Sequence, residues 1–426
     1  MSSARVVVVG AGLAGLVAAH RLRIAAIEVV VVEASSQIGG RLRTETLDGV
    51  AFEPALHALP RSSPEIGGLV AELGLSKSVR RAPLERPVTR QRDALNPVST
   101  RAVDHLPRGP LRGHRARRLR SLLEWLGGDL DPAAPDRATR LDDRCIADFA
   151  CVYLGRRAGP ELFSPLLETH FGQGPRDTSR QLLFALLNPW GDVEISLAFG
   201  LSALPEALAS GLELRTGERV ARVLPTGDGV RLASGEEIRA DAVVLAVPAT
   251  RVAELVPELT PAERGVFETA RYLDAIHLAV MCERGDSGVA NWIPQSRGGP
   301  LSGSIELPSG TPSQQLLLLI ARPTFAAACA RRSDEAVTES LLRAAESIHP
   351  GLQVRLRTSK LLRLPGSLPR FEPGRFRGVQ RLWRERVRQS EQLRVFCGDY
   401  MVGPHAEGAA ASGTRAAAEV RARLLD

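Results

Sequence analysis

The chain has 426 residues, 44% of them hydrophobic and 24% charged, which is ordinary for a soluble globular protein and long enough for two or more domains. The net charge of +7 comes almost entirely from arginine, since Lys77 and Lys360 are the only lysines, and aromatic residues make up only 4%, so no nucleic-acid partner is expected. The five cysteines are scattered without metal-ligand spacing, and no apolar run approaches the roughly 18 residues that span a bilayer. The scattered cysteines predict a cytoplasmic protein without a metal site. The first apolar run is too short for a signal peptide, so none is expected.

The glycine-rich segment GAGLAG opens the chain's first structural unit. A β-branched run, Arg5–Val9, predicts a buried strand, and Leu13–Leu22 has the apolar spacing of a helix. Gly10 permits a tight reversal, Gly12 lets the backbone approach a pyrophosphate, and Gly15 lets the helix pack on the strand. This strand, turn and helix predict a dinucleotide site.

The residues around this turn complete the nucleotide motif. Glu28–Val32 predicts a second buried strand, and Glu33 ends it about twenty residues after the glycines, where a carboxylate accepts ribose hydroxyls. The helix N-terminus places unpaired N–H groups and a partial positive charge toward the phosphates. Leu13 and Ala14 at the helix start and Ala34 after the strand are therefore further candidate cofactor contacts.

The stretch EASSQIGGRLRT, Glu33–Thr44, indicates which nucleotide is bound. It resembles the segment by which flavoproteins of the amine oxidase, protoporphyrinogen oxidase and carotenoid desaturase superfamily wrap FAD. The resemblance implies that Gly39 and Gly40 pass close to the cofactor and that Arg41 lies along its diphosphate. Two glycines permit such an approach, and arginine supplies a bidentate charge.

The loop up to residue 60 departs from the superfamily pattern. Glu53 and His57 match positions that lie near the flavin ring in the superfamily, but Pro54-Ala55 replaces the expected glycine. His57 is a candidate site residue, and a solvated loop histidine is the alternative.

The middle of the chain is expected to be mainly helical. Pro107–Gly128 places four arginines, Arg115, Arg117, Arg118 and Arg120, before an apolar stripe. Such a basic amphipathic helix can lie on an anionic membrane, and it can equally be a solvated face over a core. Further helices over Leu141–Leu187 resemble the superfamily's helical substrate cap.

Strand patterns then return. Leu212–Thr216 and Glu218–Val223 are predicted strands, and the resemblance implies that Val220 contacts the adenine through its backbone. Asp241–Ala249 predicts a buried strand stopped by proline. Asp274–Cys282 predicts another strand, on which many amine oxidases carry a lysine near flavin N5; His277 stands there instead and is a second catalytic candidate.

The C-terminal segment resembles the superfamily's last flavin motif. Leu393–Cys397 predicts a strand and Glu407–Leu425 a helix, with the glycine turn between them. The candidate cofactor contacts here are Gly398, Asp399, Gly408 and Ala409. Asp399 can accept a ribityl hydroxyl, and a helix N-terminus directed at the ring stabilises negative charge on a reduced flavin.

The fold class implied is α/β, a Rossmann-like FAD-binding domain of the glutathione-reductase type with an inserted α+β substrate domain. The expected FAD-binding domain is discontinuous, comprising residues 1–60, 200–265 and 390–426. Residues 61–199 and 266–389 are expected to form the substrate domain with its helical cap.

The function expected is an FAD-dependent oxidase or desaturase, similar to protoporphyrinogen oxidase, that removes hydride from a bulky apolar small molecule. Oxygen or another acceptor would reoxidise the flavin, because no second nucleotide fingerprint is found for NAD(P)H. A flavin amine oxidase and a non-catalytic flavin-binding protein remain as alternatives. Substrate, acceptor and oligomeric state are left open by the sequence.

Overall fold

The computed structural model describes residues 4–55, 59–60, 63–81, 87–91, 94–97, 114–126, 130–187, 194–256, 258–285, 290–388 and 394–425. The candidate His57 lies outside these residues.

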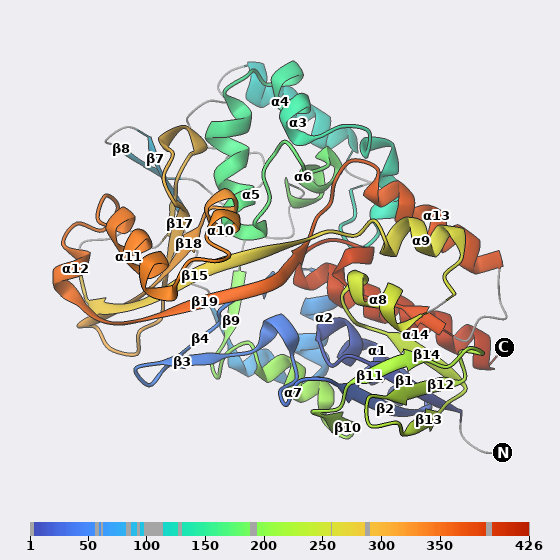
Figure 1. The fold of residues 1–426 in the computed structure, drawn as a ribbon. Coiled ribbons are helices and arrows are strands. Elements are labelled where there is room, and N and C mark those ends of the chain that lie inside the picture. Colours follow the sequence, from blue (N-terminus) through green and yellow to red (C-terminus); the bar gives the residue numbers. More distant parts are fainter. Residues whose placement is uncertain are drawn as a thin grey trace.

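A five-stranded parallel sheet gathers segments from both ends and the middle of the chain (Figure 1). Its strands, in spatial order, are β10 (Glu213–Thr216), β2 (Glu28–Glu33), β1 (Arg5–Val9), β14 (Ala242–Leu245) and β20 (Arg394–Phe396). Four consecutive valines fill β1 because both faces of a parallel sheet are covered. The predicted strands of the nucleotide unit are therefore confirmed.

Helices cover one face of this sheet. Helix α1 (Leu13–Ile24) packs on α14 (Ala406–Leu425) so closely that a Cβ on Gly413 would stand 2.3 Å from the carbonyl oxygen of Ala14. The small side chains that permit this contact include Ala14, Ala18, Ala410 and Ala417. The first and last cofactor motifs of the sequence are thereby brought together.

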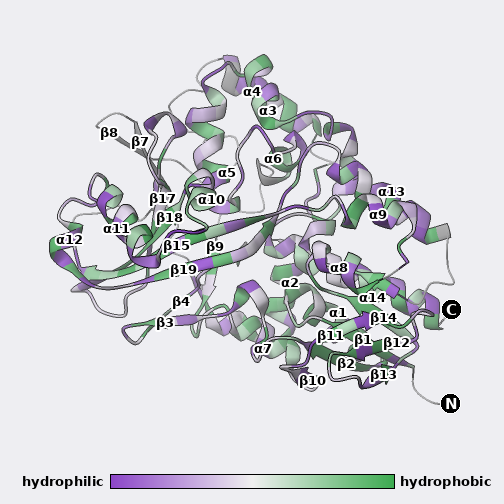
Figure 2. Ribbon diagram, in the orientation of Figure 1, coloured by the Kyte–Doolittle hydropathy of each residue, from purple (hydrophilic) through white to green (hydrophobic). Residues whose placement is uncertain are grey.

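The other face carries a small antiparallel sheet and further helices. The elements on this side are β11 (Val220–Val223), β12 (Gly229–Leu232), β13 (Glu237–Arg239), α8 (Ala249–Leu255), α9 (Pro261–Phe267) and α13 (Arg375–Arg388). In Figure 2 the strands inside the molecule are coloured as hydrophobic, because both of their faces are buried. The outer helices carry both hydrophobic and hydrophilic residues, because only one side of each helix is buried.

A second sheet has the spatial order β19-β15-β18-β17-β16-β7-β8. Its strands are β7 (Pro87–Gln91), β8 (Ala94–Pro97), β15 (Tyr272–Glu283), β16 (Ala290–Trp292), β17 (Leu301–Leu307), β18 (Gln314–Ala321) and β19 (Leu356–Pro369). The long strands β15 and β19 cross the molecule in Figure 1. Side chains along β15 point alternately to the two faces of the sheet. Ile276 and Leu278 lie in the hydrophobic core on one face, and Ala279 and Met281 lie in the core on the other face.

The remaining elements enclose this second sheet and connect it to the first. Those on or beside it are α10 (Pro323–Ala328), α11 (Asp334–Ala345), α12 (Leu352–Arg355) and the hairpin β3 (Glu45–Leu47) and β4 (Val50–Phe52). The helical cap comprises α3 (His114–Leu126), α4 (Ile146–Tyr153), α5 (Ser164–Phe171) and α6 (Arg180–Leu187). The connecting elements are α2 (Pro64–Glu72), α7 (Ala203–Ala209), β5 (Leu59–Pro60), β6 (Val79–Arg81) and β9 (Glu194–Leu197). Among the described residues, none of the helices is both long and apolar enough to cross a membrane.

Candidate cofactor and active site

The three glycines of the first turn differ in what surrounds them. Gly10 has φ +104°, and a Cβ there would stand 2.6 Å from the carbonyl oxygen of Ala246. A Cβ on Gly15 would stand 2.0 Å from the carbonyl oxygen of Gly10. Gly12, by contrast, has nothing within 4 Å of its Cβ position. Gly10 and Gly15 are therefore required by the fold itself, whereas Gly12 leaves an open cradle at the N-terminus of α1, which fits a bound diphosphate.

The Glu33 carboxylate fixes the loop beside this cradle. One of its oxygens accepts a hydrogen bond from the N–H of Ala11 and the other from the N–H of Ser35, each at 2.8 Å. Each carboxylate oxygen keeps a second lone pair for a ribose hydroxyl. The neighbouring Ala34 is exposed, and the N–H of Glu218, two residues before Val220, donates to the carbonyl oxygen of Glu33. The expected adenosine contacts therefore lie together at the carboxyl end of β2.

Replacing Glu33 by Ala is expected to weaken FAD binding by roughly 1.5–3 kcal/mol, because a charged hydrogen-bonding group is lost. Quenching of flavin fluorescence on titration into the apoprotein measures this. Glu28→Ala, at the opposite end of β2, is the matched control and should leave the affinity unchanged. Equal affinities for the Glu33 variant and the wild-type chain would show that the adenosine lies elsewhere.

The glycine pair Gly39-Gly40 lies against the Gly10–Gly15 turn. The N–H of Gly39 donates to the carbonyl oxygen of Ala11 at 2.8 Å, and a Cβ on Gly40 would come within 3.4 Å of the Cα of Gly12. Both glycines have positive φ, +95° and +58°. The GGR segment and the first turn therefore form one continuous backbone surface.

Arg41 follows this pair and reaches across to the last motif. Its guanidinium lies 2.8 Å from the carboxylate of Asp399 and donates to the carbonyl oxygen of Ser367 at 3.0 Å. Both Arg41 and Asp399 are expected from the sequence to contact the cofactor, but the sequence does not predict an ion pair between them. Segments 358 residues apart along the chain thus face each other beside the cradle.

The last motif is held by backbone-directed contacts. The N–H of Gly398 donates to the hydroxyl of Ser412 at 3.0 Å, and the N–H of Gly408 donates to Nδ1 of His405 at 2.8 Å. A Cβ on Gly408 would stand 2.5 Å from the carbonyl oxygen of Gly403, and Ala409 is buried. These contacts set the N-terminus of α14 directly after the turn that carries Asp399.

Glu407 has a role that the sequence did not indicate. Its two carboxylate oxygens accept hydrogen bonds from the N–H groups of Glu65 and Ile66, both at 2.9 Å. They therefore cap helix α2, which begins at Pro64. Burial raises the pKa of this carboxyl group. An acidic residue in the first turn of a helix usually interacts with the dipole of that same helix. That Glu407 caps a different helix could therefore be found only from the structure.

Two of the residues expected near the flavin ring have structural partners. The Glu53 carboxylate accepts a hydrogen bond from the N–H of Leu201 at 2.8 Å, and burial raises its pKa. His277 lies on β15 with its Nδ1 2.8 Å from the carbonyl oxygen of Pro54, so this nitrogen carries the proton and donates. The unusual Pro54 thus supplies the acceptor that orients His277. Burial lowers the pKa of His277 to about 4, which makes the ring neutral at pH 7.

Neither lysine is on the strand that carries His277. Lys360 lies on the neighbouring strand β19, opposite Ala279, and its ammonium group is 2.7 Å from the Glu45 carboxylate. Lys77 follows helix α2 in a short turn. Strand β15 therefore carries no lysine, and its buried His277 is a neutral imidazole at pH 7.

The buried His277 predicts a loss of stability in acid. Its folded pKa of about 4 lies below the ordinary histidine value of 6.5, so the unfolded chain takes up the proton first as the pH falls. The neutral His277 contributes fully to the free energy of unfolding above pH 6.5, and this contribution is lost as the pH falls through 4. The total loss is on the order of 3 kcal/mol. Urea unfolding at pH 7.5 and at 4.5 measures it. The loss between these pH values should be smaller in His277→Gln, and an identical loss in both proteins would contradict the assignment.

Comparison with known proteins places this geometry in a family. The model of the flavin-containing amine oxidoreductases matches residues 13–421. The chain belongs to this family. Coproporphyrinogen III oxidase of Mycobacterium tuberculosis is 30% identical over 276 residues, which cover 60% of this chain and 61% of that oxidase. This aligned part is less than two thirds of the relative's length.

Solved structures of the family share the fold over the full chain. Cyclohexylamine oxidase from Brevibacterium oxydans superposes with a TM-score of 0.78 at 16% identity, covering 100% of both chains. A proposed protoporphyrinogen oxidase from Exiguobacterium sp. 255-15 gives 0.76 at 20% identity, covering 99% of both. As a member of the flavin-containing amine oxidoreductases, the protein is an enzyme, an oxidoreductase that uses FAD. The open cradle at Gly12 fits that cofactor.

Proposed function

We propose that this flavin-containing amine oxidoreductase removes hydride from a bulky, mostly apolar ring system of the porphyrinogen type. Bound FAD supplies the hydride acceptor, its N5 atom. The observation that carries the proposal is the neutral, buried His277 on a strand without lysine. The resemblance to amine oxidases implies a lysine at this position for enzymes that oxidise amines. The 276-residue similarity to a coproporphyrinogen III oxidase supports the same substrate class.

We assign roles to the site residues on the same basis. The Gly10–Gly15 turn, with Leu13 and Ala14, and Arg41 would hold the diphosphate, and Glu33 with Ala34 and the Val220 backbone would hold the adenosine. Asp399 would hold the ribityl chain, and the α14 N-terminus at Gly408 and Ala409 would face the ring. His277, oriented by Pro54, would relay a proton at its second nitrogen, and His57 stays a candidate for the same step.

The domain division follows this assignment. Residues 1–60, 200–265 and 390–426 would bind FAD, and residues 61–199 and 266–389 would bind substrate. Cys397, directly before the Gly398 turn, is fully buried, and burial raises the pKa of its thiol to about 12. A neutral, enclosed thiol is a poor nucleophile, so we infer that the FAD is bound non-covalently.

Product analysis tests the substrate class. The FAD-loaded protein is incubated in air with coproporphyrinogen III, protoporphyrinogen IX, putrescine and cyclohexylamine. The proposal expects porphyrin absorbance and fluorescence to rise faster than in a protein-free control, with no aldehyde or ketone from the amines. Oxidation of an amine, with porphyrinogen oxidation no faster than the control, would favour the amine oxidase alternative. Absence of any turnover would favour a non-catalytic flavin protein.

Lys360 is expected to be dispensable for substrate oxidation. Its ammonium group is already paired with Glu45, and its side chain is 44% exposed, so it provides no enclosed group for hydride transfer. Lys360→Met should change the rate of flavin reduction by less than about threefold, with a stability loss within the range of about 0–1 kcal/mol for a surface pair. Lys77→Met is the matched control. A fall of orders of magnitude in the Lys360 variant alone would overturn the assignment.

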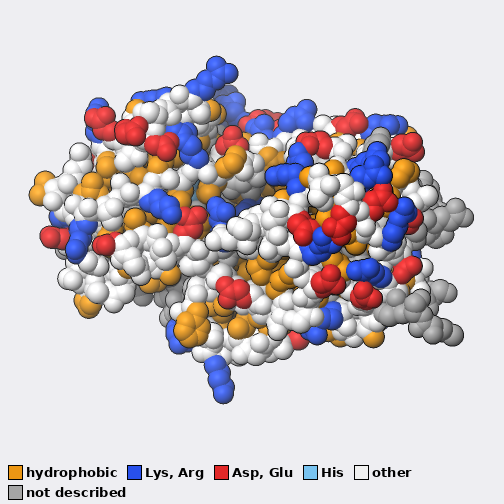
Figure 3. Space-filling model, turned by 60° about the horizontal axis from the view of Figure 1, so that its bottom comes forward, with side chains coloured by type: hydrophobic (Ala, Val, Ile, Leu, Met, Phe, Trp, Pro, Cys, Tyr) orange, Lys and Arg blue, Asp and Glu red, His pale blue; other side chains and the backbone are white. Residues whose placement is uncertain are grey.

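We include in the proposal a peripheral contact with an anionic membrane, made by Trp125 and the exposed arginines of α3. The apolar stripe of this helix, Leu119, Leu123 and Leu126, is buried in the core of the cap. Trp125 is 74% exposed, the Arg140 guanidinium lies 5.7 Å from its ring centroid, and Arg117 and Arg118 are exposed nearby on the same helix. An indole flanked by arginines suits a lipid headgroup region. A nucleic-acid partner is not expected, and on the face drawn in Figure 3 basic and acidic side chains are interleaved.

A further inference from the structure

A hollow of about 430 Å³ lies between helices α9 and α13, which run side by side (Figure 1). Its volume is within the range of small-molecule sites. The lining that concerns us is made by the backbones of Gly265, Gly374 and Gly378 and the side chains of Asp143, Arg377 and Arg381. These residues lie within the FAD-binding and substrate domains, but none of them is among the individual residues that were assigned above a role toward FAD or substrate.

Two of the glycines have no role in the packing of the described chain. Gly265 and Gly378 lie inside helices, where glycine is less stabilising than alanine. Glycine is normally kept for a positive φ or for a close backbone approach. Neither residue has a positive φ, and a Cβ at either would have nothing within 4 Å. The space in front of both glycines is therefore open in the fold and accessible to a small molecule.

The charged groups of the hollow favour an anion. Arg377 and Arg381 are four residues apart and so lie on one face of α13. The Arg377 side chain is fixed because its Nε donates to the carbonyl oxygen of Asp142 at 2.9 Å. Arg381 is exposed and has no ion-pair partner among the residues that the structure describes. Asp143 is already neutralised by Arg180, at 2.7 Å, and Arg144.

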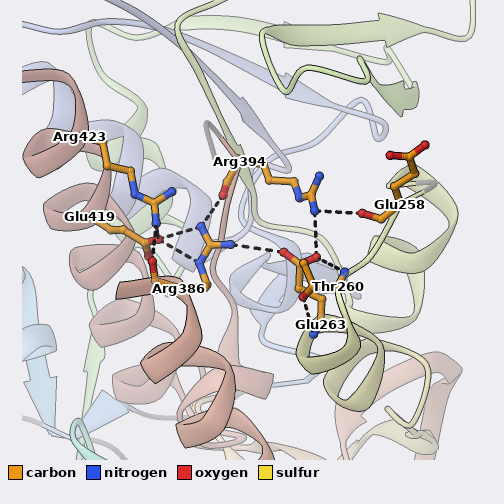
Figure 4. A network of polar contacts seen from close by, with 7 residues as sticks. All are labelled: Glu258, Thr260, Glu263, Arg386, Arg394, Glu419 and Arg423. Atoms are coloured by element: carbon orange, nitrogen blue, oxygen red, sulfur yellow. Dashed lines mark hydrogen bonds and ion pairs between the residues drawn. The ribbon is translucent and has the colours of Figure 1, made fainter. Parts of the chain in front are cut away.

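The walls of the hollow are pinned by a buried polar network (Figure 4). Thr260 and Glu263 form a capping box at the start of α9. The Glu263 carboxylate also lies 2.9 Å from Arg394 and 3.5 Å from Arg386 of α13, and both Glu263 and Arg386 are buried. Because α9 and α13 are held in this way, the site is preformed. Binding of a ligand would therefore cost little entropy for ordering these two helices.

We propose that this hollow binds a small organic anion, whose carboxylate or phosphate group is held by Arg381 and Arg377 while its remainder lies on the glycine backbones. The site is separate from the flavin site and does not depend on the function proposed for it. Guanidinium groups bind carboxylates and phosphates by the same paired geometry, so the two sources are distinguished by experiment.

Calorimetric titration of the FAD-loaded protein at constant ionic strength tests the proposal, with citrate as the carboxylate probe and glycerol 3-phosphate as the phosphate probe. We expect saturable binding of one of them. Arg381→Gln should weaken it by about tenfold to a hundredfold, the loss of a charged hydrogen bond. Arg384→Gln, an exposed arginine of the same helix outside the hollow, is the matched control and should bind like the wild-type protein.

A filling variant provides a second test that does not depend on charge. Gly378→Leu should abolish binding, while the melting temperature stays equal or rises because leucine is the better helix former. The proposal is overturned if neither probe binds saturably, if Arg381→Gln and Arg384→Gln lose affinity equally, or if Gly378→Leu binds as the wild-type protein does.

Discussion

Gly12→Val is expected to give a folded protein that purifies without FAD. The Gly12 backbone has φ −75° and ψ 175°, which valine adopts readily, and its Cβ position is free of protein atoms. The valine side chain would instead occupy the space through which the diphosphate reaches the N–H groups of α1. Several charged hydrogen bonds would be lost together, so we expect FAD affinity to fall by more than about a hundredfold.

The measurement combines flavin content with the stability of the apoprotein. Gly12→Val should be colourless, with a thermal midpoint close to that of wild-type protein stripped of FAD. Gly15→Val is the contrast, because its Cβ would stand 2.0 Å from a backbone oxygen and the turn itself would have to open. That variant should be destabilised even without cofactor. A fully loaded, yellow Gly12→Val would mean that the diphosphate does not lie at this turn.

Arg322→Met is expected to destabilise the protein by roughly 3–5 kcal/mol, because it leaves a buried carboxylate unpaired. Arg322 and Glu168 are each 4% exposed and form an ion pair that joins the helical cap to the second sheet. Arg322 also donates to the carbonyl oxygen of Leu301 at 2.9 Å, and Ser164 donates to Glu168. Chemical unfolding followed by circular dichroism measures the loss.

Two further variants make the Arg322 result interpretable. Arg343→Met removes an exposed pair with Glu339, whose side chains are 72% and 69% exposed, and should cost less than about 0.5 kcal/mol. Adding Glu168→Leu to Arg322→Met removes the stranded charge and should recover most of the stability. If Arg322→Met costs no more than Arg343→Met, the pair does not hold the cap to the sheet.

The nucleotide-binding part of the fold could be predicted because its signals are local. The valine run of β1, the three glycines and the second valine run ending at Glu33 each follow from strand burial and turn geometry within thirty-three residues. The end of the first helix carries no local signal, since alanines stand after Ile24 where a terminating glycine is usual. The structure shows that Ala26 itself takes the left-handed conformation, with φ +60°, so an alanine ends this helix at the cost of some strain.

The contacts between distant segments could not be predicted from a single sequence. The pairs Arg41 with Asp399, Glu407 with the start of α2, and His277 with Pro54 join residues more than two hundred positions apart. Each partner alone is an ordinary polar residue or a proline. Pro54 departs from the superfamily pattern. Its role as the hydrogen-bond acceptor for His277 depends on how the second sheet packs on the first.

The proposed flavin site contains His277 and no lysine, and we expect it to oxidise a porphyrinogen. Stopped-flow mixing of the FAD-loaded protein with coproporphyrinogen III under anaerobic conditions tests this expectation most directly, because bleaching of the bound flavin reports hydride transfer itself. We expect rapid bleaching with coproporphyrinogen III, slower bleaching in His277→Gln and none with putrescine. Rapid bleaching by putrescine, with none by the porphyrinogen, would contradict it.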